Sequence, residues 1–216
     1  TAYVIDNGDG TTNSGDTIIN QPTFDNYSIS GLVGWWKLDE SSGNTAIDSS
    51  GNGNNVTNNG ATVTATGYDG SLYGAYSFDG TDDYITTGDI NTGSGGLGIT
   101  TNRITVSCWA MSNEATGNWS ANGCLISKRD GFVLHPNAGN KTIYFMIRDG
   151  STTYFSGTYT MNDIKTWHLY TGTYDGSYVG LYIDGIEVVK TSHSDKTIYN
   201  DNGPLRIGVD DYADSS

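Results

Sequence analysis

Short β-prone runs follow one another at close intervals from Leu32 onward, and this spacing constrains the fold more than any other feature of the sequence. The runs are rich in Val, Ile, Thr, Tyr and Phe, and the Gly, Asn and Asp residues between them favour tight turns. YFMIR, LYTGTY and LYIDG alternate apolar or aromatic residues with others, which is the period-two pattern of strands with one buried face. This density of runs predicts an all-β, two-sheet antiparallel β-sandwich.

The predicted strands are VGWWKL, TVTAT, GAYSF, YITTG, ITVSCWAM, CLISKR, GFVLH, TIYFMIRD, TTYFSGTY, TWHLYTGTY, VGLYIDG, IEVVKT and PLRIGVD. A hairpin turn is predicted at Asp184-Gly185, and no segment shows helical periodicity. Residues 1–30 are polar, punctuated by glycine and broken by Pro22, so they are predicted to form an N-terminal extension or edge strand. Residues 31–216 then make one all-β domain, for which the 216-residue chain is long enough.

The charge of the chain restricts its partners. The formal net charge is −14, from 24 acidic and 10 basic residues, which opposes binding to nucleic acid and to anionic membranes. No run approaches the length of apolar sequence that a transmembrane helix needs, so no membrane insertion is expected. A surface rich in acids and poor in lysine is typical of a secreted protein, and we predict an extracellular or cell-surface location.

Two cysteines, Cys108 and Cys124, lie in the strand-like runs TVSCWAM and CLISKR. The polar connection between these runs could fold them into an antiparallel pair, and an extracellular location would favour a cross-strand disulfide. Buried free thiols are the alternative, because small thiols are common in protein cores.

Two loops rich in Asp, Asn and Gly carry the oxygen ligands that calcium prefers. Calcium takes about six to eight oxygens, and such loops offer carboxylates, amide oxygens and backbone carbonyls together. If the loops converge, the ligands are predicted to be Asp48, Asn52 and Asn54 from one and Asp79, Asp82 and Asp83 from the other. The alternative is that these residues form ordinary turns, in which Asp and Asn side chains bond their own backbone.

Five motifs in order give the chain a resemblance to a known family. They are GLVGWWKLDESSGNTAIDSSGNGNN, GSLYGAYSFDGTDDYI, ITVSCWAM, TWHLYTGTYDGSYVGLYIDGIEVV and GPLRIGVD. Their order resembles the LamG-like jelly-roll domains of the concanavalin A-like lectin/glucanase superfamily. The resemblance covers residues 32–211 and implies two packed antiparallel sheets that bind sugars or proteins on a concave face or at the rim, often with calcium there.

The chain departs from this family at its end. Members close with a strand after the LRIG strand, whereas this sequence stops at DYADSS. Three explanations stay open: the sequence is truncated, residues 1–30 supply the missing strand, or a neighbouring subunit donates one.

Sugar binding requires exposed aromatic rings with polar groups beside them. Trp35, Trp36, Trp109 and Trp167 lie within strand motifs and are interpreted as mainly core residues, whereas Trp119 lies in a polar loop, where it either folds back or meets a ligand. The predicted ligand-binding residues are Trp119, Tyr154, Arg148 and Tyr178.

Catalysis has little support in the sequence. The glutamates Glu40, Glu114 and Glu187 do not form the E-x-D-x-x-E strand expected of a retaining glycosidase of this superfamily. The sequence therefore predicts a non-catalytic carbohydrate-binding or adhesion module with a structural calcium, whose partner is a polysaccharide or glycoprotein glycan. The alternative is a structural subunit of a surface filament or adhesin, assembled with copies of itself through residues 1–30 or an open sheet edge.

Overall fold

The structure of this protein is a computed structural model. It describes residues 3–5, 17–19, 31–87, 102–120, 123–128, 130–199 and 203–210. The chain divides into two compact units, residues 1–32 and residues 33–216. The described strands of the first unit are β1 (Tyr3–Ile5) and β2 (Thr17–Ile19), which pair antiparallel.

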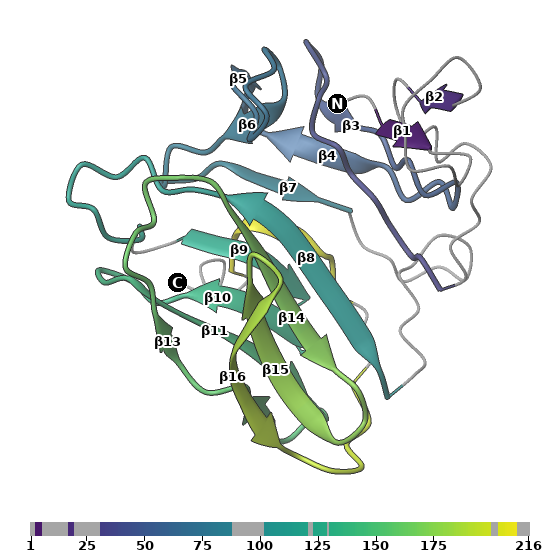
Figure 1. Ribbon diagram of the computed structural model, residues 1–216, viewed down its shortest axis with the longest axis vertical. Helices are drawn as coiled ribbons and strands as arrows, with labels where there is room; N and C mark the ends of the chain where they lie inside the picture. Colours follow the sequence, from purple (N-terminus) through teal and green to yellow (C-terminus); the bar gives the residue numbers. More distant parts are fainter. Residues whose placement is uncertain are drawn as a thin grey trace. The chain divides into compact units, whose positions relative to one another are not determined.

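The larger sheet of the second unit contains nine strands within the described residues (Figure 1). In spatial order they are β12 (Thr153–Phe155), β11 (Thr142–Arg148), β10 (Phe132–Pro136), β9 (Gly123–Lys128), β17 (Arg206–Val209), β7 (Tyr84–Thr86), β4 (Val56–Asn59) and β3 (Thr45–Ala46), with β13 (Tyr159–Thr160) also paired to β11. Every pairing in this sheet is antiparallel.

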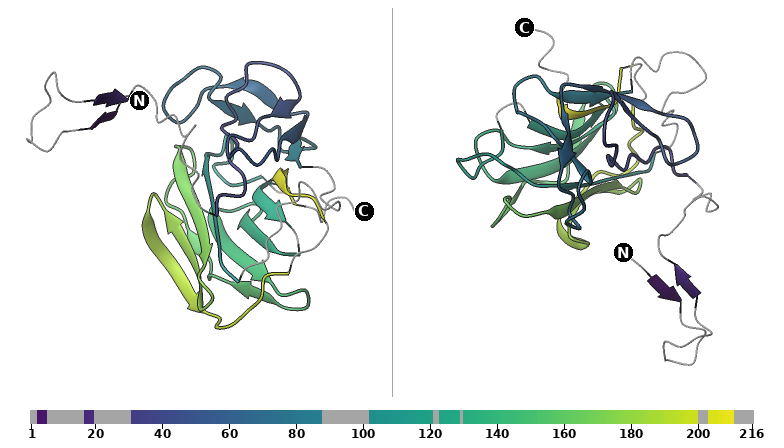
Figure 2. Two further views of the ribbon diagram at one scale, coloured as in Figure 1. Left: turned by 90° about the vertical axis from the view of Figure 1, so that its right-hand side faces the viewer. Right: turned by 90° about the horizontal axis from the view of Figure 1, so that it is seen from above.

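The smaller sheet lies opposite as a second layer (Figure 2). Its four strands, in spatial order, are β16 (Ile186–Ser192), β15 (Tyr178–Ile183), β14 (His168–Tyr174) and β8 (Ile104–Ala110). A separate pair is formed by β5 (Thr62–Ala65) and β6 (Ala75–Ser77). The predicted all-β sandwich is thus confirmed, and no stretch of the described chain forms a helix long and apolar enough to cross a membrane.

The core lies between the inner faces of the two sheets. Phe132, Leu134 and Phe145 point inward from the larger sheet, and Tyr170 and Leu181 point inward from the smaller one; each is at most 3% exposed. Strand β14 has its buried residues at alternate positions, as the period-two pattern of TWHLYTGTY predicts. Each sheet therefore has one inner face that packs in the sandwich and one outer face.

The hairpin turn between β15 and β16 is where the sequence predicted it. Asp184 and Gly185 both have positive φ values, +52° and +80°. This is the backbone of a type I′ turn, whose twist matches that of the flanking strands and for which Asp-Gly is a preferred sequence.

The predicted strand VGWWKL is wrong. Within residues 33–38 the only strand-like contact is a single bridge between Trp36 and Asp48. The Trp36 ring folds back over Gly34, where an added Cβ would lie 2.4 Å from it, and the ring nitrogen donates to the carbonyl of Asn54 at 2.7 Å. Leu38 then has a φ of +56°, which a strand does not allow. These local contacts replace the ladder of a regular strand.

The predicted disulfide is also contradicted, because both cysteines are free. Their strands do not pair with each other: β8 pairs with β14, and β9 pairs with β10 and β17. Cys108 packs against the core between the sheets, where burial raises the pKa of its thiol to about 12. Cys124 instead packs with Val133 and Met146. The two thiols thus belong to different clusters.

Candidate functional site

Asp48 organises the first of the two acidic loops. Its Oδ1 accepts hydrogen bonds from the backbone N–H groups of Trp35 (3.0 Å) and Ser50 (2.9 Å). Its Oδ2 accepts from the Ser50 hydroxyl (2.7 Å) and the Asn54 N–H (2.9 Å). Both carboxylate oxygens are therefore engaged by donors from the protein, which is the environment of a structural turn and not of a metal ligand.

The pKa of Asp48 reflects this network. Burial alone would raise it, but the hydrogen bonds from Ser50, Trp35 and Asn54 outweigh that effect and lower the pKa below the usual value of 3.8. The neighbouring amides are engaged as well, because Asn52 and Asn54 both donate to the carbonyl of Val33. The segment around Val33 is held in place by Asp48, Asn52 and Asn54. The interpretation of this loop as a structural turn therefore fits better than its interpretation as a metal site.

The second acidic loop brings three carboxylates together. In the turn between β6 and β7, ligand atoms of Asp79, Asp82 and Asp83 lie within 4.8 Å of one another. Asp79 Oδ1 accepts from Thr81 N–H, and Asp83 Oδ2 accepts from Asp79 N–H, each at 2.8–2.9 Å. Among the described His, Cys, Asp and Glu residues this is the only such group, and Asp48 does not belong to it. Of the six predicted calcium ligands, the three in this turn thus form the candidate metal site.

A second loop approaches this cluster. The hydroxyl of Ser120, in the connection from β8 to β9, donates to the carbonyl of Gly80 at 3.4 Å. An added Cβ on Gly80 would lie 3.5 Å from Glu114 Oε1, so a fourth carboxylate is close to the same turn. Carboxylate and carbonyl oxygens are the donors that calcium prefers, and the residues present fit such an ion.

Trp119 is not an exposed platform, contrary to the sequence prediction. Its side chain is 7% exposed and packs into the core, with its ring edge-on to Tyr170 at a centroid distance of 5.9 Å. Backbone hydrogen bonds to Asn140 and Gly139 hold the loop in this position. The polar loop folds its one large aromatic residue inward, because burial of the ring is favourable.

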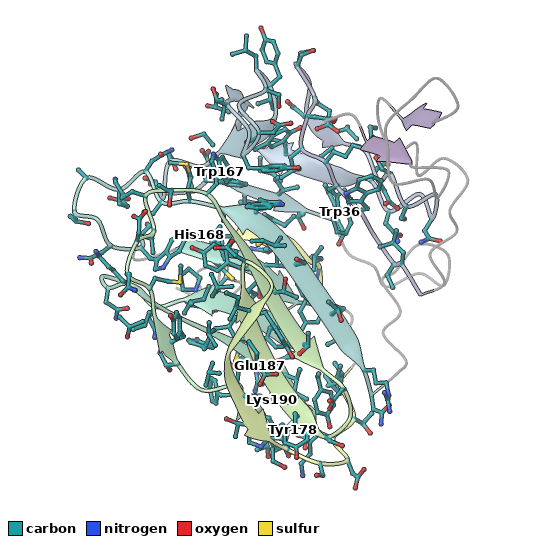
Figure 3. The ribbon with its side chains drawn as sticks, viewed as in Figure 1. Trp36, Trp167, His168, Tyr178, Glu187 and Lys190 are labelled. Carbon is teal, nitrogen blue, oxygen red and sulfur yellow. The ribbon has the colours of Figure 1, made fainter. Side chains whose placement is uncertain are left out.

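The strand tryptophans are more exposed than Trp119. Trp35, Trp36 and Trp167 are half-buried, and Trp109 is 43% exposed (Figure 3 labels Trp36 and Trp167). Trp109 lies on the outer face of β8, where it stacks on Tyr68, with ring centroids 4.4 Å apart and planes within 5° of parallel. The sequence interpretation, that at least three of these four residues are core, allows for one exposed ring, and Trp109 is that ring; Trp36 packs against the core.

The other predicted ligand residues occupy three different places. Arg148 points to the outer face of the larger sheet and pairs with Asp130 at 2.7 Å. Tyr154 lies on the opposite side, packed against the core, and its hydroxyl donates to Asp149 at 2.6 Å. This bond, with others from Thr152 and Ser151, lowers the pKa of Asp149 to about 2. Arg148 and Tyr154 therefore lie on opposite faces of the larger sheet.

Tyr178 is on the outer face of the smaller sheet. The Lys190 ammonium lies 4.7 Å from the centre of its ring and 3.4 Å from Glu187, so the three side chains follow one another along the outer face of β15 and β16, from Tyr178 at one end to Glu187 beside the hairpin turn (Figure 3). Tyr178 is 43% exposed and lies on a different sheet from Arg148.

An aromatic row on the outer face of the larger sheet was missed by the sequence analysis. It consists of Phe155 (β12), Tyr144 (β11) and His135 (β10), and it ends on Asp210 after β17. Phe155 stands edge-on to Tyr144 (5.4 Å), and Tyr144 stacks parallel to His135 (5.4 Å, 5°). His135 Nε2 lies 3.5 Å from Asp210 Oδ2, and the Ser127 hydroxyl donates to the other oxygen of Asp210. Ring, imidazole and carboxylate thus lie in one line across the strands.

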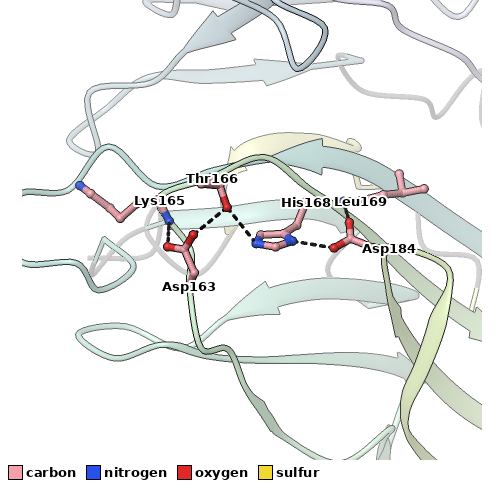
Figure 4. Close-up of polar contacts among 6 residues, drawn as sticks. All are labelled: Asp163, Lys165, Thr166, His168, Leu169 and Asp184. Carbon is pink, nitrogen blue, oxygen red and sulfur yellow. Dashed lines mark hydrogen bonds and ion pairs between the residues drawn. The ribbon is translucent and has the colours of Figure 1, made fainter.

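A second polar chain has the residue types of a hydrolase triad. His168 Nδ1 lies 2.7 Å from Asp184 Oδ2, and His168 Nε2 lies 3.2 Å from the Thr166 hydroxyl (Figure 4). The single hydroxyl proton of Thr166, however, is donated to Asp163 at 2.7 Å. The imidazole cannot withdraw a proton that points to another carboxylate, so Thr166 is not set up as a nucleophile. The chain ties the loop at 163–166 to the hairpin turn at Asp184.

The family of the chain follows from comparison with known proteins. The family profile described as the concanavalin A-like lectin/glucanases superfamily matches residues 79–216. The chain belongs to this superfamily, and the resemblance to its LamG-like jelly-roll domains is confirmed. None of the curated proteins compared gives a significant match.

Solved structures show the same fold. The receptor binding domain of botulinum neurotoxin C/D mosaic serotype aligns with a TM-score of 0.58 and 18% identity, over 80% of this chain and 42% of that one. A structure of botulinum neurotoxin type C, whose cell entry depends on two ganglioside molecules, aligns with a TM-score of 0.57 and 14% identity, over 82% of this chain and 43% of that one. The chain therefore spans less than half the length of these structures, and the likeness concerns the fold alone.

We predict that Asp48→Ala destabilises the domain, because it leaves three backbone N–H groups without their acceptor. A loss of about 2–3 kcal/mol is expected, which corresponds to a fall in the thermal midpoint of about 5–10 °C for a chain of this size. Asp175→Ala is the matched control, since Asp175 accepts from two N–H groups in an exposed turn. Equal midpoints for the two variants would contradict the structural role of Asp48.

A comparison of wild type with Asp48→Ala also tests how the stability of the domain depends on pH. The folded pKa of Asp48 is lower than its unfolded value, so the charged carboxylate stabilises the fold fully above about pH 4, and this contribution is lost as the pH falls through the folded pKa. The difference in midpoint between wild type and Asp48→Ala should therefore shrink below about pH 4. A difference that stays constant down to pH 2 would speak against this assignment.

Proposed function

We propose that this chain is an extracellular, non-catalytic carbohydrate-binding or adhesion module stabilised by calcium. The observation that carries the proposal is the aromatic row from Phe155 to Asp210. Sugars present apolar ring faces, which stack on aromatic side chains, and hydroxyl groups, which bond to carboxylates and imidazoles. The row offers both kinds of group on the outer face of one sheet.

The row lies on a firm base. Val133 and Met146, on the same outer face, are 0% and 5% exposed and form an apolar layer with Cys124, against which Tyr144 packs. Phe155 is 44% exposed and presents the accessible end of the row. Arg148 follows Tyr144 and Met146 on this face at alternate positions of β11, which adds a planar donor near the rings.

Calcium would bind at the turn between β6 and β7. Asp79, Asp82 and Asp83 would hold it, with Glu114 and the Gly80 carbonyl close by. A bound divalent cation would offset two of the three negative charges and join this turn to the loop that carries Ser120. Its role would be structural.

The charge and the carboxylate arrangement also support a binding module. A net charge of −14 opposes polyanionic partners, so a glycan or glycoprotein suits the chain better than nucleic acid. Glu40 is engaged by Tyr76 and Ile47, and Glu187 by Tyr182 and Lys190, so these two carboxylates serve separate structural contacts. Ganglioside dependence of botulinum neurotoxin type C is in keeping with a glycan ligand for this fold.

A structural subunit of a surface filament is the second candidate. The observation that favours it is that residues 1–32 form a compact unit with its own strand pair, β1 and β2, which such a subunit could use to contact a copy of itself.

We predict that calcium raises the thermal midpoint and that excess EDTA reverses the effect. At a calcium concentration one hundred times Kd the gain is about 2.7 kcal/mol, or about 5–10 °C. The double variant Asp79→Asn/Asp82→Asn should lose the response, whereas Asp175→Asn, an exposed turn carboxylate, should retain it. A midpoint that is the same in calcium and EDTA would remove calcium from the proposal.

We predict that the chain binds to a glycan array. Phe155→Ala should lower the affinity for the strongest ligand about tenfold, equivalent to about 1.4 kcal/mol. Tyr178→Ala is the matched control, because Tyr178 is an equally exposed ring on the other sheet. Isothermal titration would measure both. If Tyr178→Ala reduces affinity and Phe155→Ala does not, the glycan is bound by the smaller sheet, which contradicts the aromatic row as its site.

For the filament alternative, deletion of residues 1–30 should convert an assembled protein into a monomer, as measured by light scattering after size-exclusion chromatography. If the chain is a glycan-binding module instead, the full chain and the chain without residues 1–30 should both be monomers. Both should then bind the same glycans.

A further inference from the structure

The loop at residues 67–74, between β5 and β6, forms an exposed apolar surface together with Trp109. Tyr68, Leu72 and Tyr73 are 53%, 76% and 45% exposed, and Trp109 on β8 is 43% exposed. Large apolar side chains that gather at the surface mark an interaction site more often than single exposed residues do. This surface is distinct from the aromatic row, which lies on the other sheet.

The backbone of the loop is held by its own hydrogen bonds. Gly67 N–H donates to Ser71 O, and Gly70 N–H donates to Gly67 O, both at 3.0 Å. Asp69 Oδ1 accepts from the N–H and the hydroxyl of Ser71, and the hydroxyl bond is the main reason that the pKa of Asp69 is lowered. The loop therefore presents its side chains in a defined arrangement, which reduces the ordering cost of binding.

The close approach of the two ends of the loop requires glycine at positions 67 and 74. A Cβ added to Gly67 would lie 2.7 Å from the carbonyl oxygen of Gly74, so the two ends approach too closely for a side chain. Tyr73, just before Gly74, has a φ of +61°, an unfavourable conformation for a large residue. Strain of this kind is found most often at functional sites.

Trp109 connects the loop to the outer face of the smaller sheet. Its ring stacks on Tyr68 with a centroid distance of 4.4 Å and an angle of 5°, so each ring covers one face of the other, while Trp109 and Tyr68 remain 43% and 53% exposed. In the sheet, Trp109 is opposite Leu169 of β14, and the next outer pair is Ser107 with Thr171. Successive outer pairs are about 7 Å apart along the strands, so a ligand of one or two sugar rings reaches both.

The hydroxyls of that next pair can bond a ligand. Ser107 Oγ and Thr171 Oγ1 are 2.8 Å apart, and the Ser107 hydroxyl donates to the carbonyl of Tyr170 at 3.3 Å. With that proton engaged, Thr171 donates to Ser107, and both oxygens keep lone pairs that accept from ligand hydroxyls. The site thus combines an aromatic pair with hydrogen-bond acceptors.

We propose that Trp109, Tyr68 and the Ser107–Thr171 hydroxyl pair bind a neutral saccharide. A pyranose ring stacks on the exposed aromatic pair, and its hydroxyls bond to Ser107 and Thr171. The outer positions of β8 and β14 here, Thr105, Ser107, Trp109, Leu169, Thr171 and Thr173, carry no charge. The one ionisable side chain of the loop besides tyrosine is Asp69, and its charge, like the net charge of −14, repels anionic sugars and anionic lipid.

This inference rests on the proposed glycan-binding function for the class of ligand, but it names a separate site. The test is a titration of the full chain with neutral oligosaccharides (β-linked and α-linked glucans and chitin fragments) and with anionic ones (polygalacturonate and heparin fragments). Intrinsic fluorescence reports on the site directly. We expect a neutral ligand to change the emission, the change to be absent in Trp109→Phe, and the affinity to fall at least tenfold in Tyr68→Ala.

Further variants separate the sites and the ligand chemistry. Ser107→Ala/Thr171→Val removes the hydroxyls without removing a ring and should weaken binding several-fold, with an unchanged circular dichroism spectrum. Phe155→Ala should leave the fluorescence change intact, whereas loss of all binding in Phe155→Ala alone would overturn this site and leave the proposed function standing. Absence of any saccharide binding would overturn both.

Two other outcomes also overturn the inference. Preference for the anionic oligosaccharides would contradict the neutral character of the site. A concentration-dependent dimer that Tyr68→Ala abolishes and no saccharide competes with would assign the surface to a second copy of the chain.

Discussion

The close contact between Phe145 and Gly172 determines how the two sheets pack. Phe145 points inward from β11 and is completely buried, and its ring lies directly over the backbone of β14 at Gly172. A Cβ at Gly172 would lie 2.2 Å from the ring, so no other residue fits at this position. Tyr170 and Tyr174, on either side of Gly172 along the inner face, are 0% and 1% exposed and enclose the ring. This alternation of large and small residues gives the interior its packing density.

The close packing of the inner faces leaves two outer faces with different chemistry. The outer face of the larger sheet carries the aromatic row, with His135, Arg148 and Asp210 as ionisable groups. On the smaller sheet the outer positions of β8 and β14 carry no charge, whereas Lys190 and Glu187 bring charge to the outer positions of β16 (Figure 3). The two glycan sites that we propose therefore lie on separate sheets.

How far the sequence predicts the candidate sites depends on how local each site is. Asp79, Asp82 and Asp83 lie within five residues, so a single turn brings their carboxylates together and the sequence reveals them. The aromatic row joins residues 135, 144, 155 and 210 through strand register, which short-range patterns do not specify. The sequence left Asp48 as either a calcium ligand or a turn residue, and its hydrogen bonds favour the turn. Its oxygens accept from the backbone N–H groups of Trp35, Ser50 and Asn54, an arrangement that exists only once the chain has folded around it.

The sequence alone determined the fold class, most of the strands, the Asp184–Gly185 turn and the family, because period-two alternation and turn residues act over a few neighbouring positions. Only the tertiary structure decided which aromatic residues are buried. Trp119 lies in a polar loop yet packs on Tyr170, and Trp109 lies in a strand yet faces outward. The same holds for the cysteines, whose strands belong to different sheets. Burial and pairing depend on which segments meet across the sandwich, and contacts between residues far apart in the chain leave no periodic mark on the sequence.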